Sequence, residues 1–352
     1  MLSEAVVPHG KPIKLVVWDL DDTLWSTGAH HGDPPTLHPI ARELIATLDE
    51  RGILQSVVSS DSAHTHDWLR RLGVADYFLY PQIGVAAKPA AVKQIASALN
   101  IGLDAALLID DDPHQRAEVA RAHPIVRAVA RPALARLAAD PLMGHSLVGI
   151  EPRPRRLLYL EDQARIDCER SFPGSTADFN AFLAMRIAVA PAGSADVRRL
   201  KELVTRTNQL GATYSDDELA QLCGSPRHAC LLVSLQDRFG DCGVIGLALL
   251  EVSAERWTLQ LLVFSCRVAS RGVSTIILHA ILARARAAGV RCLAELKPTA
   301  KNQAMLVAYH QAGFAQIDTR GDVLILAHPL DGIPPLPAGV RLDFSYPPEA
   351  TR

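Results

Sequence analysis

The sequence predicts an α/β protein with an N-terminal doubly wound parallel sheet and a C-terminal mixed α/β unit. Three observations support this fold class. Short apolar runs alternate with amphipathic stretches over residues 13–145, as in parallel sheets with crossover helices. A polar, proline-rich stretch then interrupts the pattern, and a second series of strands and helices begins near residue 184. A chain of 352 residues is also long for a single core.

The N-terminal strands and helices are predicted from apolar runs and from the Pro and Gly residues that bound them. Continuous apolar runs bounded by turn residues are typical of strands buried on both faces. Such runs occur at 14–20, 53–60, 105–113 and 125–130. Stretches with helical patterning, several with Pro near the start or Gly at the end, lie between them at 39–52, 62–74, 88–102 and 115–124.

The C-terminal half predicts strands at 185–191, 228–240, 243–252, 257–265, 291–296 and 322–329, with helices at 196–210, 274–289 and 302–313. We therefore expect an antiparallel-rich sheet with helices around it. The predicted organisation is an N-terminal tail (1–12), a first domain (13–145), a linker arm (146–183), a second domain (184–330) and a Pro-rich tail (331–352).

Composition limits the classes of partner. Hydrophobic residues make up 49% of the chain and the formal net charge is −2, so no basic excess favours nucleic acid. No signal-peptide pattern or membrane-length apolar run is present, which predicts a cytoplasmic protein without a membrane partner. The six cysteines include no C-x-x-C pair, so we expect neither a structural metal site nor disulfides.

Polar side chains follow three of the predicted strands. Asp19 and Asp21 end the first strand, Ser59 ends the second, and Asp110 and Asp111 end the third. A further polar group, the Lys88 amine, precedes a predicted helix between the last two strands. Ligands of open α/β sheets bind beyond the carboxyl ends of the strands, so we expect these groups to converge on one edge.

This set of groups suits phosphoryl transfer. A carboxylate can attack phosphorus and form an aspartyl phosphate, while Mg²⁺ bound by hard oxygen ligands offsets the charge of the phosphate. A hydroxyl and an ammonium can bind the phosphate oxygens, and a second carboxylate can act as general acid and then as general base.

The motif DLDDTLW, followed by Ser59, Lys88 and IDDDP, resembles the haloacid dehalogenase superfamily of phosphatases. The resemblance implies a Rossmann-like phosphatase domain in which Asp19 is the nucleophile and Asp21 the acid/base. It also implies that Ser59 and Lys88 bind phosphate. Together with Asp19 and Asp21, Asp110 and Asp111 would hold Mg²⁺.

The C-terminal stretches RTNQL, DRFGDCGVIG, SCRVASRGV and TAKNQAM…YHQAGF resemble the FkbH-like family, and with the N-terminal motifs the resemblance covers most of residues 13–320. Such proteins couple a phosphatase-like domain to an acetyltransferase-like (GNAT-like) domain in polyketide and mixed polyketide–peptide pathways. The resemblance implies an enzyme that dephosphorylates a three-carbon acyl phosphate such as 1,3-bisphosphoglycerate. The glyceryl unit would be loaded onto the phosphopantetheine thiol of an acyl carrier protein.

Cys266 is the candidate acyl carrier of the second domain. It ends an apolar strand and is followed by Arg267 and Arg271, and nearby cations stabilise a thiolate. An inert core cysteine is the alternative. Asn302 and Tyr309 resemble the end of the acetyltransferase fold, with helix capping and core packing as the alternative. The turn before the predicted helix has only Gly272 where coenzyme A sites are richer in glycine, which argues against the usual coenzyme A cradle.

Two other functions stay open. The chain could be a plain phosphatase whose C-terminal half recognises a substrate or a carrier. It could also be a docking module with a degenerate phosphate site, because Ser60, Asp61 and Pro89 depart from the family pattern, whereas the retained Asp pair favours catalysis.

Overall fold

The chain folds into two compact units, Met1–Leu160 (unit 1) and Glu161–Arg352 (unit 2), which are described separately. The computed structural model describes residues 11–26, 34–60, 64–143, 154–193, 196, 216–265, 268, 271–299 and 302–346. The boundary falls inside the predicted linker arm (146–183). The described part of that arm contains two helices, α6 (Arg155–Ser171) and α7 (Thr176–Phe182).

Unit 1 contains a parallel sheet of five strands among its described residues, in the order β5-β4-β1-β6-β7. The strands are β1 (Leu15–Trp18), β4 (Leu54–Ser59), β5 (Gln82–Ile83), β6 (Ala106–Ile109) and β7 (Arg127–Val129). A short antiparallel pair, β2 (Trp25–Ser26) and β3 (Thr36–Leu37), follows β1. The parallel doubly wound sheet predicted from the sequence is therefore present.

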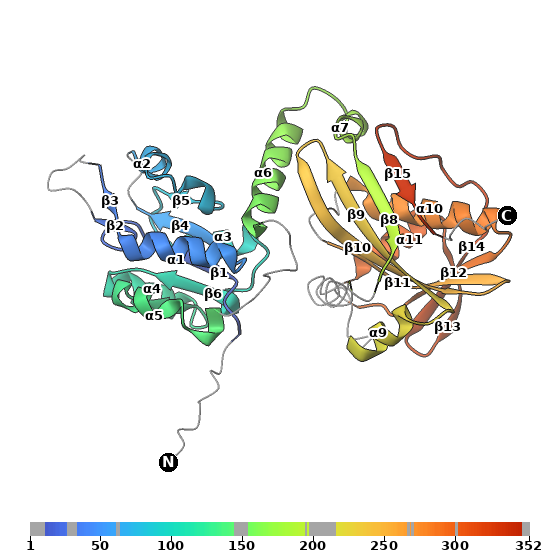
Figure 1. Cartoon of the computed structure of the whole chain (residues 1–352), viewed down its shortest axis with the longest axis horizontal. Helices are drawn as coiled ribbons and strands as arrows, with labels where there is room; N and C mark the ends of the chain where they lie inside the picture. The colour runs from blue at the N-terminus through green and yellow to red at the C-terminus, as the bar shows by residue number, and fades with distance from the viewer. Residues whose placement is uncertain are drawn as a thin grey trace, which may run out of the picture. The chain divides into compact units, whose positions relative to one another are not determined.

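Helices cover both faces of this sheet (Figure 1). Alternate residues of β1 face opposite ways, so Val16 and Trp18 pack in one core and Leu15 and Val17 in the other. The first core includes α1 (Pro39–Glu50) and α5 (Leu134–Leu137), and the second includes α3 (Lys88–Ala98) and α4 (Pro113–Ala122). Helix α2 (Thr65–Arg71) contributes Leu69 to the first core.

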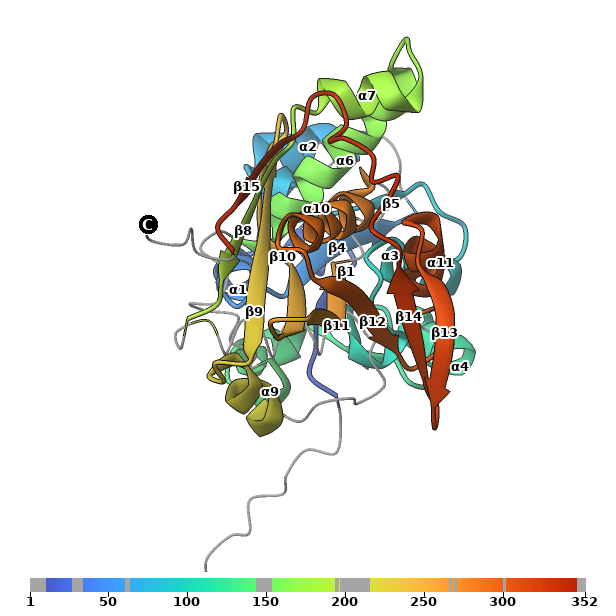
Figure 2. The ribbon, with the colours of Figure 1, turned by 90° about the vertical axis from the view of Figure 1, so that its right-hand side faces the viewer.

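Unit 2 contains a sheet in the order β13-β14-β12-β11-β10-β9-β8-β15, which is antiparallel except at β11–β12 and β8–β15. Its strands are β8 (Arg186–Pro191), β9 (His228–Asp237), β10 (Gly240–Val252), β11 (Arg256–Phe264), β12 (Arg291–Leu296), β13 (Ala315–Arg320), β14 (Val323–His328) and β15 (Arg341–Phe344). Figure 2 shows β12, β14 and β13 side by side. The predicted mixed, antiparallel-rich architecture is present.

The largest core of unit 2 lies between one face of this sheet and helices α10 (Val273–Ala287) and α11 (Gln303–Gln311). A smaller cluster on β9, β10 and β11 packs against the end of α9 (Asp216–Cys223). The Pro-rich tail contributes β15, which pairs with β8 in parallel. Unit 2 thus includes sheet residues beyond the predicted end of the second domain at residue 330.

The parallel strands β11 and β12 pair over part of their length only. The ladder joins Arg256–Leu259 to Arg291–Ala294, and β11 continues to Phe264 without pairing further with β12. At this point the β10–β11 register shifts by a bulge at Gln260. Among the buried side-chain atoms of the described residues, the Gln260 Oε1 atom alone has no hydrogen-bond partner.

One sequence prediction is wrong. Cys223, the last residue of α9, forms a disulfide with Cys230 on β9, although no disulfide was expected. The two Cα atoms lie 5.1 Å apart, within the range that a disulfide spans. The short connection between the helix and the strand brings these residues together in a spacing that is not C-x-x-C. Cys242 and Cys292 are free and buried, as expected of core cysteines.

None of the helices in the described parts of the chain is both long and apolar enough to cross a membrane.

Candidate active site

Asp19 lies where β1 ends, at the carboxyl edge of the unit 1 sheet. Its backbone N–H donates to the Ile109 carbonyl at 2.8 Å, and the Asp110 N–H donates to the Val129 carbonyl at 3.1 Å. The ends of β1, β6 and β7 are therefore tied together. This places the Asp19 and Asp110 side chains beside each other, as the strand order predicts.

The Lys88 amine bridges these two carboxylates. Its Nζ atom lies 2.6 Å from Asp19 Oδ1 and 2.6 Å from Asp110 Oδ2. All three residues are buried, with exposed fractions of 6% for Lys88, 9% for Asp19 and 0% for Asp110. Lys88 is the first residue of α3, so the start of that helix delivers the cation to the sheet edge. Buried charges need such pairing because their desolvation is costly.

Burial raises the pKa of Asp19 from 3.8 to about 6, although the charge and hydrogen bond of Lys88 oppose the rise. The pKa of Lys88 is raised because its attraction to the carboxylates outweighs the effect of burial, which alone would lower it. Lys88 therefore stays a cation. Asp19 is mostly ionised at neutral pH, as a nucleophile must be.

Asp19, Asp110 and Asp111 form a group with the spacing of a metal site. One oxygen from each carboxylate lies within 4.8 Å of the others. Hard oxygen ligands of this kind suit Mg²⁺, and the mostly exposed Asp111 leaves room for water ligands. The donor set fits the predicted ion, and these three residues would hold it.

The loops around this group are fixed by reciprocal hydrogen bonds. The buried Thr23 hydroxyl donates to Asp111 Oδ1 at 3.2 Å and accepts from the Asp111 N–H at 2.9 Å. Arg116 Nη1 donates to the carbonyls of Asp110 and Asp111, each at 2.7 Å. Sequence reasoning missed Thr23 and Arg116. The Thr inside DLDDTLW was the available signal for Thr23, and nothing pointed to Arg116.

Asp21 is not part of the carboxylate group with metal spacing. Its Oδ1 accepts a hydrogen bond from the Trp25 indole N–H at 2.8 Å. Ser59 is buried at the end of β4, two residues beyond Val57, which pairs with Trp18. Both residues lie at the predicted sheet edge. Their roles as acid/base, metal ligand and phosphate ligand stay predictions.

The predicted acyl site of unit 2 is described only in part. Cys266 and Arg267 lie outside the described residues. Arg271 is buried, and its guanidinium pairs with Asp237 at 3.1 Å and with Asp162 at 2.9 Å. Its Nη1 also lies 3.3 Å from the Sγ atom of Cys242.

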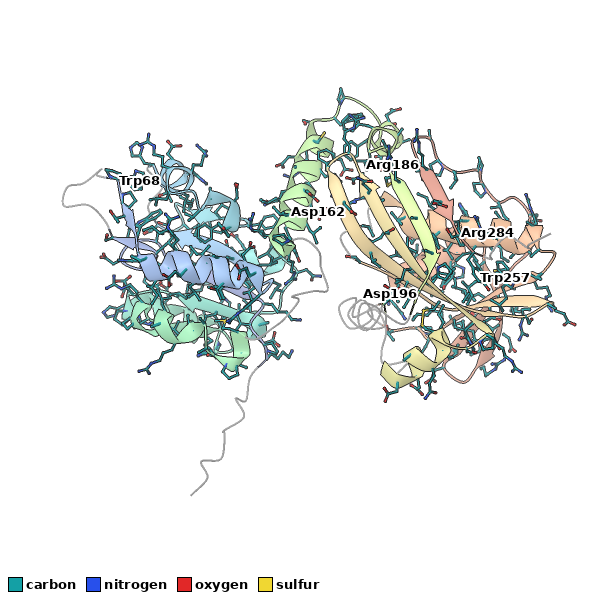
Figure 3. The ribbon with its side chains drawn as sticks, viewed as in Figure 1. Trp68, Asp162, Arg186, Asp196, Trp257 and Arg284 are labelled. Atoms are coloured by element: carbon teal, nitrogen blue, oxygen red, sulfur yellow. A yellow bond between two sulfur atoms is a disulfide. The ribbon has the colours of Figure 1, made fainter. Side chains whose placement is uncertain are left out.

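The same two carboxylates bind a second arginine. Arg165 on α6 pairs with Asp237 at 2.8 Å and also with Asp162, which lies on the same helix (Figure 3). The four charged side chains thus hold the second half of α6 to the end of β9 and to Arg271, which lies two residues before the start of α10. Arg271 therefore has a structural role in this network.

Asn302 and Tyr309 are also buried. The Asn302 side chain accepts from the Thr299 N–H at 2.7 Å and donates to the Lys297 carbonyl at 2.8 Å, so it fixes the turn after β12. The Tyr309 ring packs edge-on against Phe314 at 5.3 Å, and burial raises the pKa of its hydroxyl. These contacts are those expected of turn-forming and core residues.

The fold and the site thus define a two-unit α/β chain with a carboxylate-lined, lysine-bridged site in unit 1. No protein-family model matches the chain, and no curated protein matches it. Similar solved structures include a Thermoplasma acidophilum N-acetyltransferase in complex with coenzyme A (17% identity, 40% of this chain, 98% of that one, TM-score 0.33). The Escherichia coli ribosomal-protein-S18-alanine N-acetyltransferase is similar at 17% identity (41% of this chain, 94% of that one, TM-score 0.33).

A third similar structure is the N-terminal part of a Bacteroides fragilis protein, which contains a phosphatase domain complexed with Mg. It is 22% identical over 39% of this chain and 41% of that one, with a TM-score of 0.33. This chain thus spans less than half of that structure. Likenesses at these identities and scores establish neither a family nor an activity for the chain.

Proposed function

We propose that unit 1 is a Mg²⁺-dependent phosphatase domain that uses Asp19 as its nucleophile. The supporting observation is the buried bridge from Lys88 to Asp19 and Asp110 at the carboxyl edge of a parallel sheet. At this edge a cation can bind the oxygens of a phosphate ester, and clustered carboxylates can bind a metal ion.

In the proposed reaction, an Asp19 carboxylate oxygen attacks the phosphorus of the substrate and the bond from phosphorus to the leaving oxygen breaks. Asp21 gives a proton to that oxygen, so an alcohol leaves and Asp19 holds the phosphoryl group. Water then attacks the phosphorus, Asp21 takes a proton from it, and inorganic phosphate leaves. Lys88 and Ser59 would bind the phosphate oxygens. Mg²⁺ bound by Asp19, Asp110 and Asp111 would offset the negative charge of the phosphate.

For the whole chain, the proposal is an FkbH-like enzyme that couples this chemistry to acyl transfer. Its substrate would be a phosphorylated three-carbon acyl phosphate such as 1,3-bisphosphoglycerate. The Cys266 thiolate would attack the acyl carbon, and the bond from that carbon to the phosphate oxygen would break, so that inorganic phosphate leaves. The acyl group would then pass from Cys266 to the phosphopantetheine thiol of an acyl carrier protein, which frees the Cys266 sulfur. The amide-containing pantetheine arm would lie beside Gln260, where β11 and β12 no longer pair. The proposal involves neither nucleic acid nor membrane.

Phosphatase activity is tested by turnover of phosphate monoesters with and without Mg²⁺. We expect Mg²⁺-dependent release of phosphate that is lost in Asp19→Asn. Lys88→Met should lose the same activity, and Lys93→Met is the matched control for it, because Lys93 is an exposed lysine on the same helix. Activity that persists in Asp19→Asn would contradict the proposal.

Acyl loading is tested by the intact mass of a phosphopantetheinylated carrier protein incubated with enzyme, 1,3-bisphosphoglycerate and Mg²⁺. We expect a glyceryl adduct on the carrier that is absent with Cys266→Ala. No adduct on any of several carriers would count against loading.

A plain phosphatase is the second candidate, and one observation favours it. Arg271 is committed to buried ion pairs and Tyr309 to the core, so two residues of the predicted acyl site have structural roles. This candidate predicts phosphate ester turnover that Cys266→Ala leaves intact, with no acyl adduct on a carrier.

A further inference from the structure

Asp21 has a fixed hydrogen-bond donor on one of its two oxygens. The Trp25 indole N–H donates to Asp21 Oδ1 at 2.8 Å, and Trp25 is only 1% exposed. Asp21 itself is partly exposed, so its carboxylate lies at the border between the core and the open sheet edge.

The Trp25 ring is held in place from several sides. The Trp25 backbone pairs with Leu37 in the β2–β3 ladder, and the Trp25 backbone N–H donates to the Leu20 carbonyl at 3.1 Å. The ring of Trp68 on α2 (Figure 3) packs edge-on against it, with centroids 6.2 Å apart and planes at 88°. The direction of the indole N–H is thus set by the core and the backbone, and it does not depend on the substrate.

We propose that Trp25 is a positioning residue that assigns the proton transfer of Asp21 to a single oxygen. An indole nitrogen is a donor only, so Oδ1 must accept from it whether or not the carboxyl group carries a proton. The proton then resides on Oδ2. The inference deepens the proposed function and rests on it, because it assumes that Asp21 is the acid/base.

The proposed steps balance at that atom. As the bond between phosphorus and the leaving oxygen breaks, that oxygen takes the electron pair and accepts the proton from Oδ2. In the second half, Oδ2 takes back a proton from water as the water oxygen bonds to phosphorus and the Asp19–phosphorus bond breaks. Without the indole N–H, the carboxyl group can rotate and present either oxygen, so fewer conformers are productive.

The test is Trp25→Phe, which removes the N–H and keeps most of the buried ring. The readout is the first half-reaction, measured by rapid quench in single turnover, with two substrates. The p-nitrophenolate of p-nitrophenyl phosphate leaves without help from an acid, whereas the alkoxide of glycerol phosphate needs a proton. We expect the rate with glycerol phosphate to fall about tenfold, because the free energy of one charge-assisted hydrogen bond is lost from the transition state. The rate with p-nitrophenyl phosphate changes less than about twofold on the same scale.

Trp18→Phe is the matched control. Trp18 is equally buried in the same core, and its indole N–H donates to Gln55 at 3.1 Å, away from Asp21. Loss of this hydrogen bond changes the rates with both substrates by one common factor. If Trp25→Phe does not fold, 3-benzothienylalanine at position 25 keeps the ring size and replaces N–H by sulfur.

Equal slowing of both substrates by the Trp25 variants, or no slowing of either, would overturn the inference. These outcomes differ from a failure of the proposed function. In that case the wild-type protein itself would show no Mg²⁺-dependent turnover sensitive to Asp19→Asn.

Discussion

The replacement Lys88→Met tests the electrostatics of the site. The Lys88 amine contacts the carboxylates of Asp19 and Asp110, and these two residues are 9% and 0% exposed. Removal of the amine therefore leaves two neighbouring buried anions without their cation. Removing one partner of a buried ion pair lowers the free energy of unfolding by about 3–5 kcal/mol. We expect a loss of unfolding free energy of this size at pH 7 without Mg²⁺.

The loss should depend on pH with a definite sign. In the wild-type protein the pKa of Asp19 is already raised to about 6, above its ordinary value of 3.8. A carboxyl group with a raised folded pKa favours the native state at low pH, and this contribution is lost as pH rises through the folded pKa. Removal of Lys88 raises the pKa further. Lys88→Met should therefore be closest to wild type near pH 4 and least stable, relative to it, above pH 6.

Urea melts of wild type, Lys88→Met and Lys93→Met at pH 4.5 and pH 7.5 would measure these differences. The Lys93→Met control should match wild type at both pH values, because Lys93 is exposed. Added Mg²⁺ should restore part of the lost stability, since the ion offsets the same charges. If Lys88→Met unfolds like wild type at pH 7.5 without Mg²⁺, the buried bridge does not exist as described.

Three further predictions concern single residues. Asp111→Asn should weaken Mg²⁺ binding, measured by calorimetry, by about tenfold because one charged ligand is lost. In unit 2, Asp237→Asn should cost about 3–5 kcal/mol in urea melts because it removes the charge of the more deeply buried of the two carboxylates that Arg165 and Arg271 share. The exposed pair of Arg170 is the control for it, and Arg170→Gln should cost less than about 1 kcal/mol. Burial lowers the pKa of His328, so unit 2 should lose stability as pH falls below 6.5, by up to about 1.4 kcal/mol per pH unit for this group. His328→Gln should reduce this slope, and His279, whose pKa burial also lowers, should account for part of what remains.

The predicted features of unit 1 come from strong local signals. Parallel strands buried on both faces require apolar runs, so β1, β4 and β6 were visible in the sequence. Because the carboxyl ends of such strands share one edge of the sheet, the proximity of Asp19 and Asp110 could be predicted from the sequence. The bridging position of Lys88 could not be derived, since it depends on where α3 begins relative to the sheet.

The features that sequence reasoning missed depend on contacts between distant or unpatterned residues. Asp237 and Arg165 form an ion pair although they are 72 residues apart in the sequence, and no periodic pattern indicates such a pair. The buried ion pairs of Arg271 could not be foreseen for the same reason, and its place at an acyl site stays a prediction. The Cys223–Cys230 disulfide arises from the short connection between α9 and β9.

The central claim is that Asp19 is phosphorylated during turnover. The most direct measurement is an acid quench of enzyme, Mg²⁺ and a phosphate monoester in the steady state, followed by borohydride reduction and peptide mass spectrometry. Borohydride converts an aspartyl phosphate to homoserine. We predict this conversion at residue 19 in the wild-type protein, and none when the same protein is quenched before substrate is added. Turnover with residue 19 always recovered as unmodified aspartate, or with the modification at another carboxylate, would contradict the claim.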